Sequence, residues 1–204
     1  MGFYNGWLFP RLLDLVMQQK QMIPFRRRIG NAATGRVLDV GIGSGLNLPF
    51  YGDQTQSVLG IDPSAELLHF AEERAHNAST PIELLRASGE ALPIEDHSID
   101  TAVVTFTLCT VDNATTTLTE IRRVLRPGGR LLFAEHGRAP EHSVARWQDR
   151  LTPIWRQIAG GCHLNRKPDD LIRSAGFRIE ALDTGYLRAP RPMGFVYAGS
   201  ACAI

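Results

Sequence analysis

The sequence predicts an α/β protein with a doubly wound, mostly parallel seven-stranded sheet and helices on both of its faces. Three observations carry this prediction. Strand-like and helix-like patterns alternate through the middle of the chain, an apolar segment runs into closely spaced glycines at 41–45, and a Pro-Gly-Gly turn at 127–129 separates a helical segment from a strand-like one. Alternating βαβ units align their strands in parallel, and the crossover helices cover the sheet.

The expected elements follow one another in order. Parallel strands are expected at 36–40, 56–61, 82–87, 99–106 and 130–135. Helices are expected between them at 46–51, 64–76 and 114–125. The second helix begins at Ser64, a good N-cap residue, and the third ends before the turn that starts at Arg126.

The pattern changes after residue 136. A long amphipathic helix is expected at 142–160 and a short one at 168–175. Two further strands near 177–183 and 193–200 are expected to complete the sheet as an antiparallel hairpin.

The glycine-rich turn indicates a nucleoside-binding site. Glycines at 41, 43 and 45 follow an apolar strand and let the backbone turn sharply and approach a ligand. Asp62 closes the next strand, where an acid can accept hydrogen bonds from a ribose diol. A dinucleotide-binding loop needs glycine where this chain has Leu46, so the pattern disfavours pyrophosphate binding and a dehydrogenase.

Residues 1–35 precede the sheet and form a predicted N-terminal helical lid or cap, with a helix at 11–21. One interpretation is a helix packed on the edge of the core. A second is a lid over the nucleoside and acceptor pocket, with Tyr4 or Trp7 pointing inward. A membrane-surface anchor is the third interpretation and is less favoured than the other two.

Composition narrows the class of protein. The 204 residues suit a single domain, and 22 basic against 21 acidic residues give a net charge of +1, so we expect no nucleic-acid partner and no peripheral membrane contact. The short basic run Arg26–Arg28 is interpreted as a solvated helix face. Three cysteines without metal-ligand spacing indicate reduced thiols in a cytoplasmic protein, and the adjacent pair Cys162-His163 predicts no metal site. No leader or membrane-spanning segment is expected.

The motifs between 36 and 136 resemble those of class I S-adenosylmethionine (SAM) dependent methyltransferases, in the broad group that includes the ubiquinone and menaquinone C-methyltransferases. The motifs that carry this resemblance are Asp39–Gly45, Gly60–Asp62, Gly89–Pro93 and Val124–Gly129. The resemblance implies a Rossmann-like fold, SAM as the cofactor, and residues 36–204 as the methyltransferase domain.

A narrower likeness extends over nearly the whole chain. Thr107–Val111, Ala134–His136 and Gly161–Arg166 resemble the methyltransferase-like thiol S-methyltransferase branch and its bacterial relatives, which often carry a phospholipid methyltransferase label. This likeness implies a small or lipid-like methyl acceptor, with S-methylation of a small or lipophilic thiol as the leading hypothesis. N-methylation of a phospholipid head group, C-methylation of a quinone-like acceptor, and a SAM-binding regulatory protein without catalysis are the alternatives.

The resemblance assigns most of the cofactor site residue by residue. It implies that Asp39, Gly41, Gly43 and Gly45 surround the methionine part of SAM, with Thr105 along the methionine chain.

The nucleoside part of SAM is assigned to two further segments. Asp62 is expected to bind the ribose hydroxyls and Pro63 to lie beside the adenine. Ser88 stands where many relatives have an acid that meets the adenine amine, a departure that weakens this side-chain contact. The N–H of Gly89 and the neighbouring Glu90 complete the expected cofactor site.

Two histidines are the candidate catalytic residues. A thiol with a pKa of about 8–9 needs only modest help to ionise near neutral pH, from an imidazole acting as a base or as a cation. His136, at the end of the fifth strand, is the leading candidate, and His163 is the second.

Overall fold

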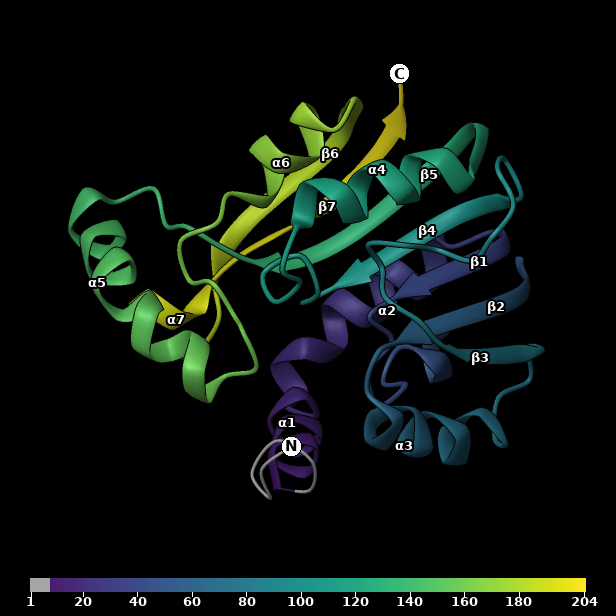
Figure 1. The fold of residues 1–204 in the computed structure, drawn as a ribbon, viewed down its shortest axis with the longest axis horizontal. Coiled ribbons are helices and arrows are strands. Elements are labelled where there is room, and N and C mark those ends of the chain that lie inside the picture. The colour runs from purple at the N-terminus through teal and green to yellow at the C-terminus, as the bar shows by residue number, and fades with distance from the viewer. Residues whose placement is uncertain (1–7) are drawn as a thin grey trace.

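The computed structural model describes residues 8–204, so the predictions for Tyr4 and Trp7 lie outside the described residues. Its sheet has the strand order β3-β2-β1-β4-β5-β7-β6. The strands are β1 (Gly35–Val40), β2 (Thr55–Asp62), β3 (Ile82–Arg86), β4 (Ile99–Thr105), β5 (Leu125–His136), β6 (Phe177–Tyr186) and β7 (Phe195–Ala203). The first five pair in parallel, and β7 pairs antiparallel with both β5 and β6 (Figure 1). The doubly wound sheet with an antiparallel C-terminal hairpin is confirmed.

Helices cover both faces of this sheet (Figure 1). Three of them, α2 (Ile23–Ala32), α3 (Ala65–Ala75) and α4 (Ala114–Val124), precede the C-terminal helices α5 (His142–Ile158), α6 (Pro168–Ser174) and α7 (Arg191–Gly194). Alternating strand residues explain the two layers. Leu38, Val104 and Phe133 face a core that contains α4 and α6, whereas Val37 and Val103 face a second core with α2 and α3.

Two expected elements differ in the structure. The predicted helix 46–51 is only a 3-10 turn, η3 (Leu48–Phe50), because Pro49 contributes no N–H and Gly52 follows after one residue. The strand predicted at 130–135 begins earlier, at Leu125, directly after α4. Residues 126–129 bulge out of the ladder, since Ile99 pairs with Leu125 and Thr101 with Arg130, and Gly128 takes a positive φ of 79° in this bulge.

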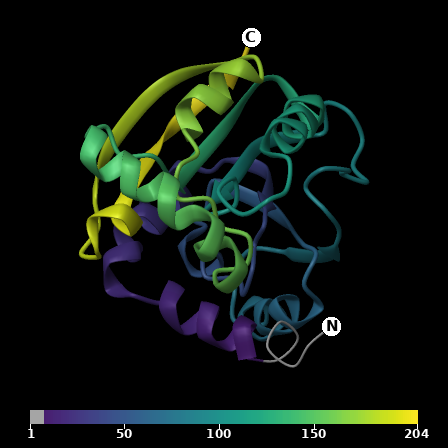
Figure 2. The same cartoon turned by 60° about the vertical axis from the view of Figure 1, so that its left-hand side comes forward.

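The N-terminal segment is helical but broken. Helix α1 (Phe9–Met17) is followed by the 3-10 turn η2 (Lys20–Met22) and then by α2, in place of one helix at 11–21. In Figure 2, α1 crosses one end of the sheet between α3 and the C-terminal end of α5. Within residues 8–204, no helix is long and apolar enough to span a bilayer.

Candidate functional site

The glycine-rich turn lies at the carboxyl end of β1, where open α/β sheets bind their ligands. Gly41 has a φ of +68°, and a Cβ at this position would lie 2.5 Å from the side chain of Thr107. Thr107 is itself fixed, because its hydroxyl donates to the carbonyl of Val40 at 3.0 Å. The sequence therefore needs glycine here for both backbone conformation and space, which leaves peptide groups at the cavity surface.

Asp62 is held in place by two backbone donors. Its Oδ2 accepts from the N–H of Gly43 at 3.0 Å and its Oδ1 from the N–H of Ser64 at 2.9 Å. Burial raises the pKa of Asp62, and these two hydrogen bonds oppose that rise. Each carboxylate oxygen keeps a lone pair for a ligand hydroxyl, so the geometry suits a ribose diol. Ser64 also caps α3, since its hydroxyl accepts from the N–H of Leu67 at 3.2 Å.

Asp39 lies behind the glycine turn and is fully buried. Its Oδ2 accepts from the hydroxyl of Tyr51 at 2.8 Å and from the amide of Asn47 at 3.1 Å. Its Oδ1 has no hydrogen-bond partner within the described part of the chain. Burial raises the pKa of Asp39 to about 6, against the opposing effect of those two bonds and of nearby Arg26. A buried carboxylate oxygen without a partner fits a cationic group, as the ammonium of a methionine moiety would supply.

Three residues of this network were missed by sequence reasoning: Arg26, Asn47 and Tyr51. Arg26 donates to Oδ1 of Asn47 at 2.7 Å and is buried, so the interpretation of Arg26–Arg28 as a solvated helix face is wrong for its first residue. The guanidinium leaves the solvent because it meets the buried polar group of Asn47 and the carboxylate of Asp39 nearby. No spacing along the chain links these three residues.

A cavity of about 480 Å³ opens in front of these groups. Eight of the ten predicted cofactor residues line it: Gly41, Gly43, Asp62, Pro63, Ser88, Gly89, Glu90 and Thr105. The other two do not line it. Asp39 accepts from the lining residue Asn47, and Gly45 lies against Leu48 and Ala71. Glu90 accepts from the N–H of Asn113 at 2.8 Å, which ties the segment after β3 to the N-terminus of α4.

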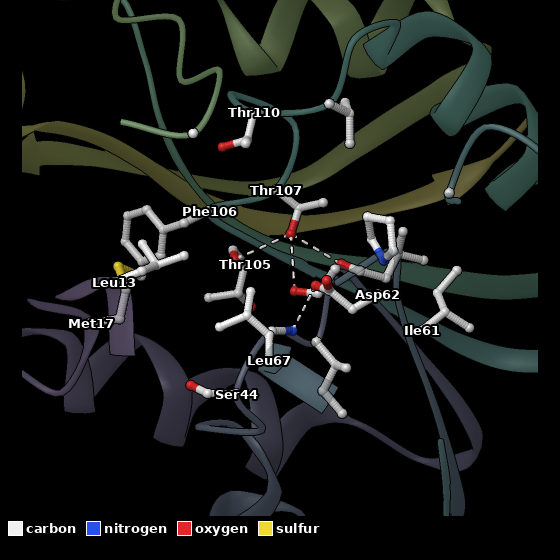
Figure 3. A pocket seen from close by; sticks show the side chains of 18 of the residues that line it. Leu13, Met17, Ser44, Ile61, Asp62, Leu67, Thr105, Phe106, Thr107 and Thr110 are labelled. Carbon is white, nitrogen blue, oxygen red and sulfur yellow. Dashed lines mark hydrogen bonds between the residues drawn. The ribbon is translucent and has the colours of Figure 1, made fainter. Parts of the chain in front are cut away.

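The opposite half of the cavity is apolar. Phe9, Leu13 and Met17 of α1 line it together with Phe106 and Val111, which follow β4. Figure 3 shows Leu13, Met17 and Phe106 on one side of the cavity, with Asp62 and Ile61 on the other.

Helix α1 is held over the cavity at two points. Arg74 of α3 forms an ion pair with Asp14 at 3.0 Å and also donates to the carbonyl of Ser44 in the glycine turn. At the other end of α1, Phe9 packs against Gly160, where a Cβ would lie 2.5 Å from Cζ of Phe9.

The two candidate catalytic histidines are not among the residues that line the cavity. His136 is buried, and burial lowers the pKa of its imidazole to about 4, so the ring is neutral near pH 7. His163 lies in the loop after α5, and its backbone N–H donates to the carbonyl of Cys109 at 2.7 Å. The structure therefore places neither histidine on the cavity surface.

Comparison with known proteins agrees with this geometry. Residues 38–133 match the family model of a methyltransferase domain. The chain is also 35% identical over 173 residues to the human thiol S-methyltransferase TMT1B, an alignment that covers 82% of this chain and 69% of that protein. The chain belongs to the SAM-dependent methyltransferases. The cofactor of this chain is thus SAM, and its family membership identifies it as an enzyme.

Two further relatives of this methyltransferase are a second thiol S-methyltransferase and an enzyme named for a different acceptor. It is 37% identical over 145 residues to thiol S-methyltransferase TMT1B of Rattus norvegicus, covering 69% of this chain and 59% of that protein. It is 35% identical over 159 residues to phosphatidylethanolamine N-methyltransferase of Cereibacter sphaeroides, covering 72% of this chain and 76% of that protein. The methyltransferase therefore spans 59% to 69% of the length of the two thiol S-methyltransferases.

Solved structures share the fold of this methyltransferase. A SAM-dependent methyltransferase from Mesorhizobium loti superimposes with a TM-score of 0.67 at 21% identity, covering 91% of this chain and 99% of that one. One from Aquifex aeolicus gives a TM-score of 0.65 at 18% identity, covering 96% and 98%.

Proposed function

We propose that this enzyme transfers the methyl group of SAM to a small or lipophilic thiol. The observation that carries the proposal is the chemistry of the acceptor half of the cavity. Phe9, Leu13, Met17 and Phe106 make it apolar. Arg26 is the single Lys, Arg or His among the described lining residues, and its guanidinium already donates a hydrogen bond to Asn47. A phospholipid head group carries a phosphate that would require a free cation.

The proposed chemistry asks little of an acid or base in the protein. SAM supplies an electrophilic methyl group on a sulfonium, and the acceptor must attack it in line. Asp62 and the glycine turn orient the donor, while the apolar half excludes water and holds the acceptor's carbon chain. A thiol with a pKa of about 8–9 is partly ionised near neutral pH, so alignment supplies most of the rate.

A histidine base stays a prediction for His136 and His163. Because the ring of His136 is neutral near pH 7, only the base role is compatible with its burial, and a cationic role is not. Replacing either residue by alanine should lower kcat with nearly unchanged SAM affinity if the residue takes part in proton transfer. An equal loss of kcat and of SAM affinity would indicate that the histidine only supports the structure.

We also propose that residues 1–35 act as a lid. Helix α1, which belongs to this segment, contributes three apolar side chains to the cavity and is anchored through Asp14 and Phe9. An arrangement of this kind can open for the substrate and close over it.

An acceptor panel tests the proposed function. The purified chain is incubated with SAM and with alkyl thiols of increasing length, sulfide, vesicles that contain phosphatidylethanolamine, and a soluble quinol, while S-adenosylhomocysteine is measured. We expect turnover on thiols, with kcat/KM rising with chain length. Turnover on vesicles or quinol without turnover on any thiol would overturn the proposal, and so would no turnover on any acceptor.

A further inference from the structure

A second group of chemically reactive side chains lies close to the cavity residues Thr110 and Gly160. It joins Cys109 from the loop after β4, His136 from the end of β5 and Cys162 from the loop after α5. One ligand atom from each of these residues lies within 4.8 Å of the other two. Cys162 Sγ is 3.8 Å from Nδ1 of His136. The prediction of no metal site considered only neighbours along the chain, and this group comes from three separate segments.

We propose that Cys109, His136 and Cys162 form a Zn²⁺ site. Two thiolates and an imidazole are the donors that zinc prefers over hard cations such as Mg²⁺. Zinc–sulfur bonds of about 2.3 Å and zinc–nitrogen bonds of about 2.0–2.1 Å place tetrahedral ligand atoms about 3.5–3.8 Å apart. The 3.8 Å separation between Cys162 and His136 already matches this spacing, and the upper limit of 4.8 Å for the other pairs requires a shift of about 1 Å.

The imidazole of His136 is an independent sign of a ligand. The residue is 7% exposed, and its Nε2 is buried without a hydrogen-bond partner among residues 8–204. Its Nδ1 meets only the sulfur of Cys162, at a distance typical of a weak contact. Buried ring nitrogens normally have partners, so this ring is short of one. Coordination through Nδ1, the nitrogen that faces Cys162, would replace this weak sulfur contact with a full metal–ligand bond.

The loops that carry the two cysteines are rigidly held. Buried Glu135 accepts from the N–H of Thr107 at 2.8 Å and from that of Cys109 at 3.3 Å. Arg166 donates to the carbonyls of Leu108 at 2.6 Å and of Val111 at 2.7 Å. These contacts bind the loop after β4 to β5 and to the loop after α5, so the three ligands need little rearrangement to meet an ion.

The proposed site is distinct from the SAM cavity but adjacent to it. Thr110 and Gly160 line the cavity, and they precede or follow the two cysteines by no more than two residues. Three protein ligands leave one position of a tetrahedral zinc ion for water or a small ligand. The proposal does not depend on which acceptor the enzyme methylates, because its test measures metal binding alone.

Metal titration of the full chain tests the site. The protein is reduced with a phosphine, freed of metal by a chelator, and titrated with Co²⁺ and then with Zn²⁺. We expect one equivalent of Co²⁺ to produce a thiolate-to-cobalt charge-transfer band and tetrahedral d–d bands, which one equivalent of Zn²⁺ abolishes. Cys109→Ser and Cys162→Ser should each lose about half of the charge-transfer intensity, since one thiolate stays in place, and His136→Ala should bind at least about tenfold more weakly. Cys202→Ser, on β7 and outside the group, is the matched control and should behave as wild type.

A second measurement covers variants that fold poorly. In the wild-type chain, Zn²⁺ should protect Cys109 and Cys162, but not Cys202, from alkylation by iodoacetamide, as read by mass spectrometry. The proposal is overturned if the reduced wild-type protein gives no charge-transfer band and no selective protection. It is equally overturned if Cys162→Ser, with normal SAM affinity, keeps the full intensity of the band, or if Cys109 and Cys162 form a disulfide and the reduced pair binds no metal.

Discussion

The two halves of the cavity are built in different ways. The donor half consists of segments that follow strands β1, β2 and β3, and its carboxylates are fixed by backbone and side-chain donors, as at Asp62 and Asp39. The acceptor half comes from α1 and from the loops after β4 and α5, and its inner surface is mainly apolar. Fixed polar groups recognise one defined ligand, whereas an apolar surface selects by size and shape. If SAM binds as proposed, the donor half is built to select one ligand, and the acceptor half leaves room for substrates to vary among relatives.

The largest expected effect is on the donor half. Asp62→Ala removes two charge-assisted acceptors from the ribose and should weaken SAM binding by about 1.5–3 kcal/mol, roughly 10- to 150-fold in Kd. Isothermal titration calorimetry with SAM measures the change. The KM for the acceptor, measured at saturating SAM, should stay within about twofold. An unchanged SAM affinity would show that the ribose does not bind at Asp62.

A pH titration sharpens the role of Asp39. Burial raises its pKa to about 6, and its ionised form is the one that attracts a cationic donor. SAM affinity should therefore be constant above about pH 7 and fall as the pH drops through 6, by about tenfold between pH 8 and pH 5. Asp62, whose pKa burial also raises, adds to the fall in the same direction.

The Asp39→Asn variant is the control for this titration. It keeps the side-chain shape but removes the titrating group, so it should bind SAM more weakly at pH 8 and show a flatter pH profile. A wild-type profile without any fall between pH 7 and pH 5 would contradict the assignment.

Helix α1, the described part of the proposed lid, allows a matching experiment on the acceptor half. Phe9→Ala removes an aromatic ring that lines the cavity and packs on Gly160, and should raise the acceptor KM by about fivefold, the equivalent of about 1 kcal/mol of apolar contact. Leu15→Ala on the same helix is the control, because this side chain is 67% exposed and does not line the cavity. Equal effects of the two variants would argue against a specific lid contact.

The smallest effect is expected at Ser88. Its hydroxyl accepts from the N–H of Glu90 at 3.2 Å, and a neutral side chain gives a weaker contact with the adenine amine than a carboxylate. Ser88→Ala should therefore change SAM affinity by less than about threefold, equal to about 0.7 kcal/mol. A loss as large as that of Asp62→Ala would show that the serine makes a major contact with the adenine.

The contrast between the halves also explains what the sequence could predict. Gly41–Gly45 and Asp62 act through local backbone geometry at strand ends, so their spacing was sufficient to predict the fold and to predict residues that line the cavity. Arg26 and Asn47 meet across 21 positions of the chain, and Cys109 and Cys162 come together through long-range contacts of Glu135, His163 and Arg166. Such long-range contacts leave no periodic pattern in one sequence. The helix predicted at 46–51 was wrong because Pro49 and Gly52 shorten it to one turn.

Arg74 holds the proposed lid by an electrostatic contact. One guanidinium, three-quarters shielded from solvent, joins Asp14 of α1 to the carbonyl of Ser44 in the glycine turn. Lifting α1 therefore separates this charge pair, whereas the bond from Arg74 to Ser44 can stay in place. Dissolved ions weaken such a pair, although partial burial limits their effect. If release of the demethylated donor limits turnover, moderate salt should raise kcat. Ionic strength would then control the rate of ligand exchange at this cavity.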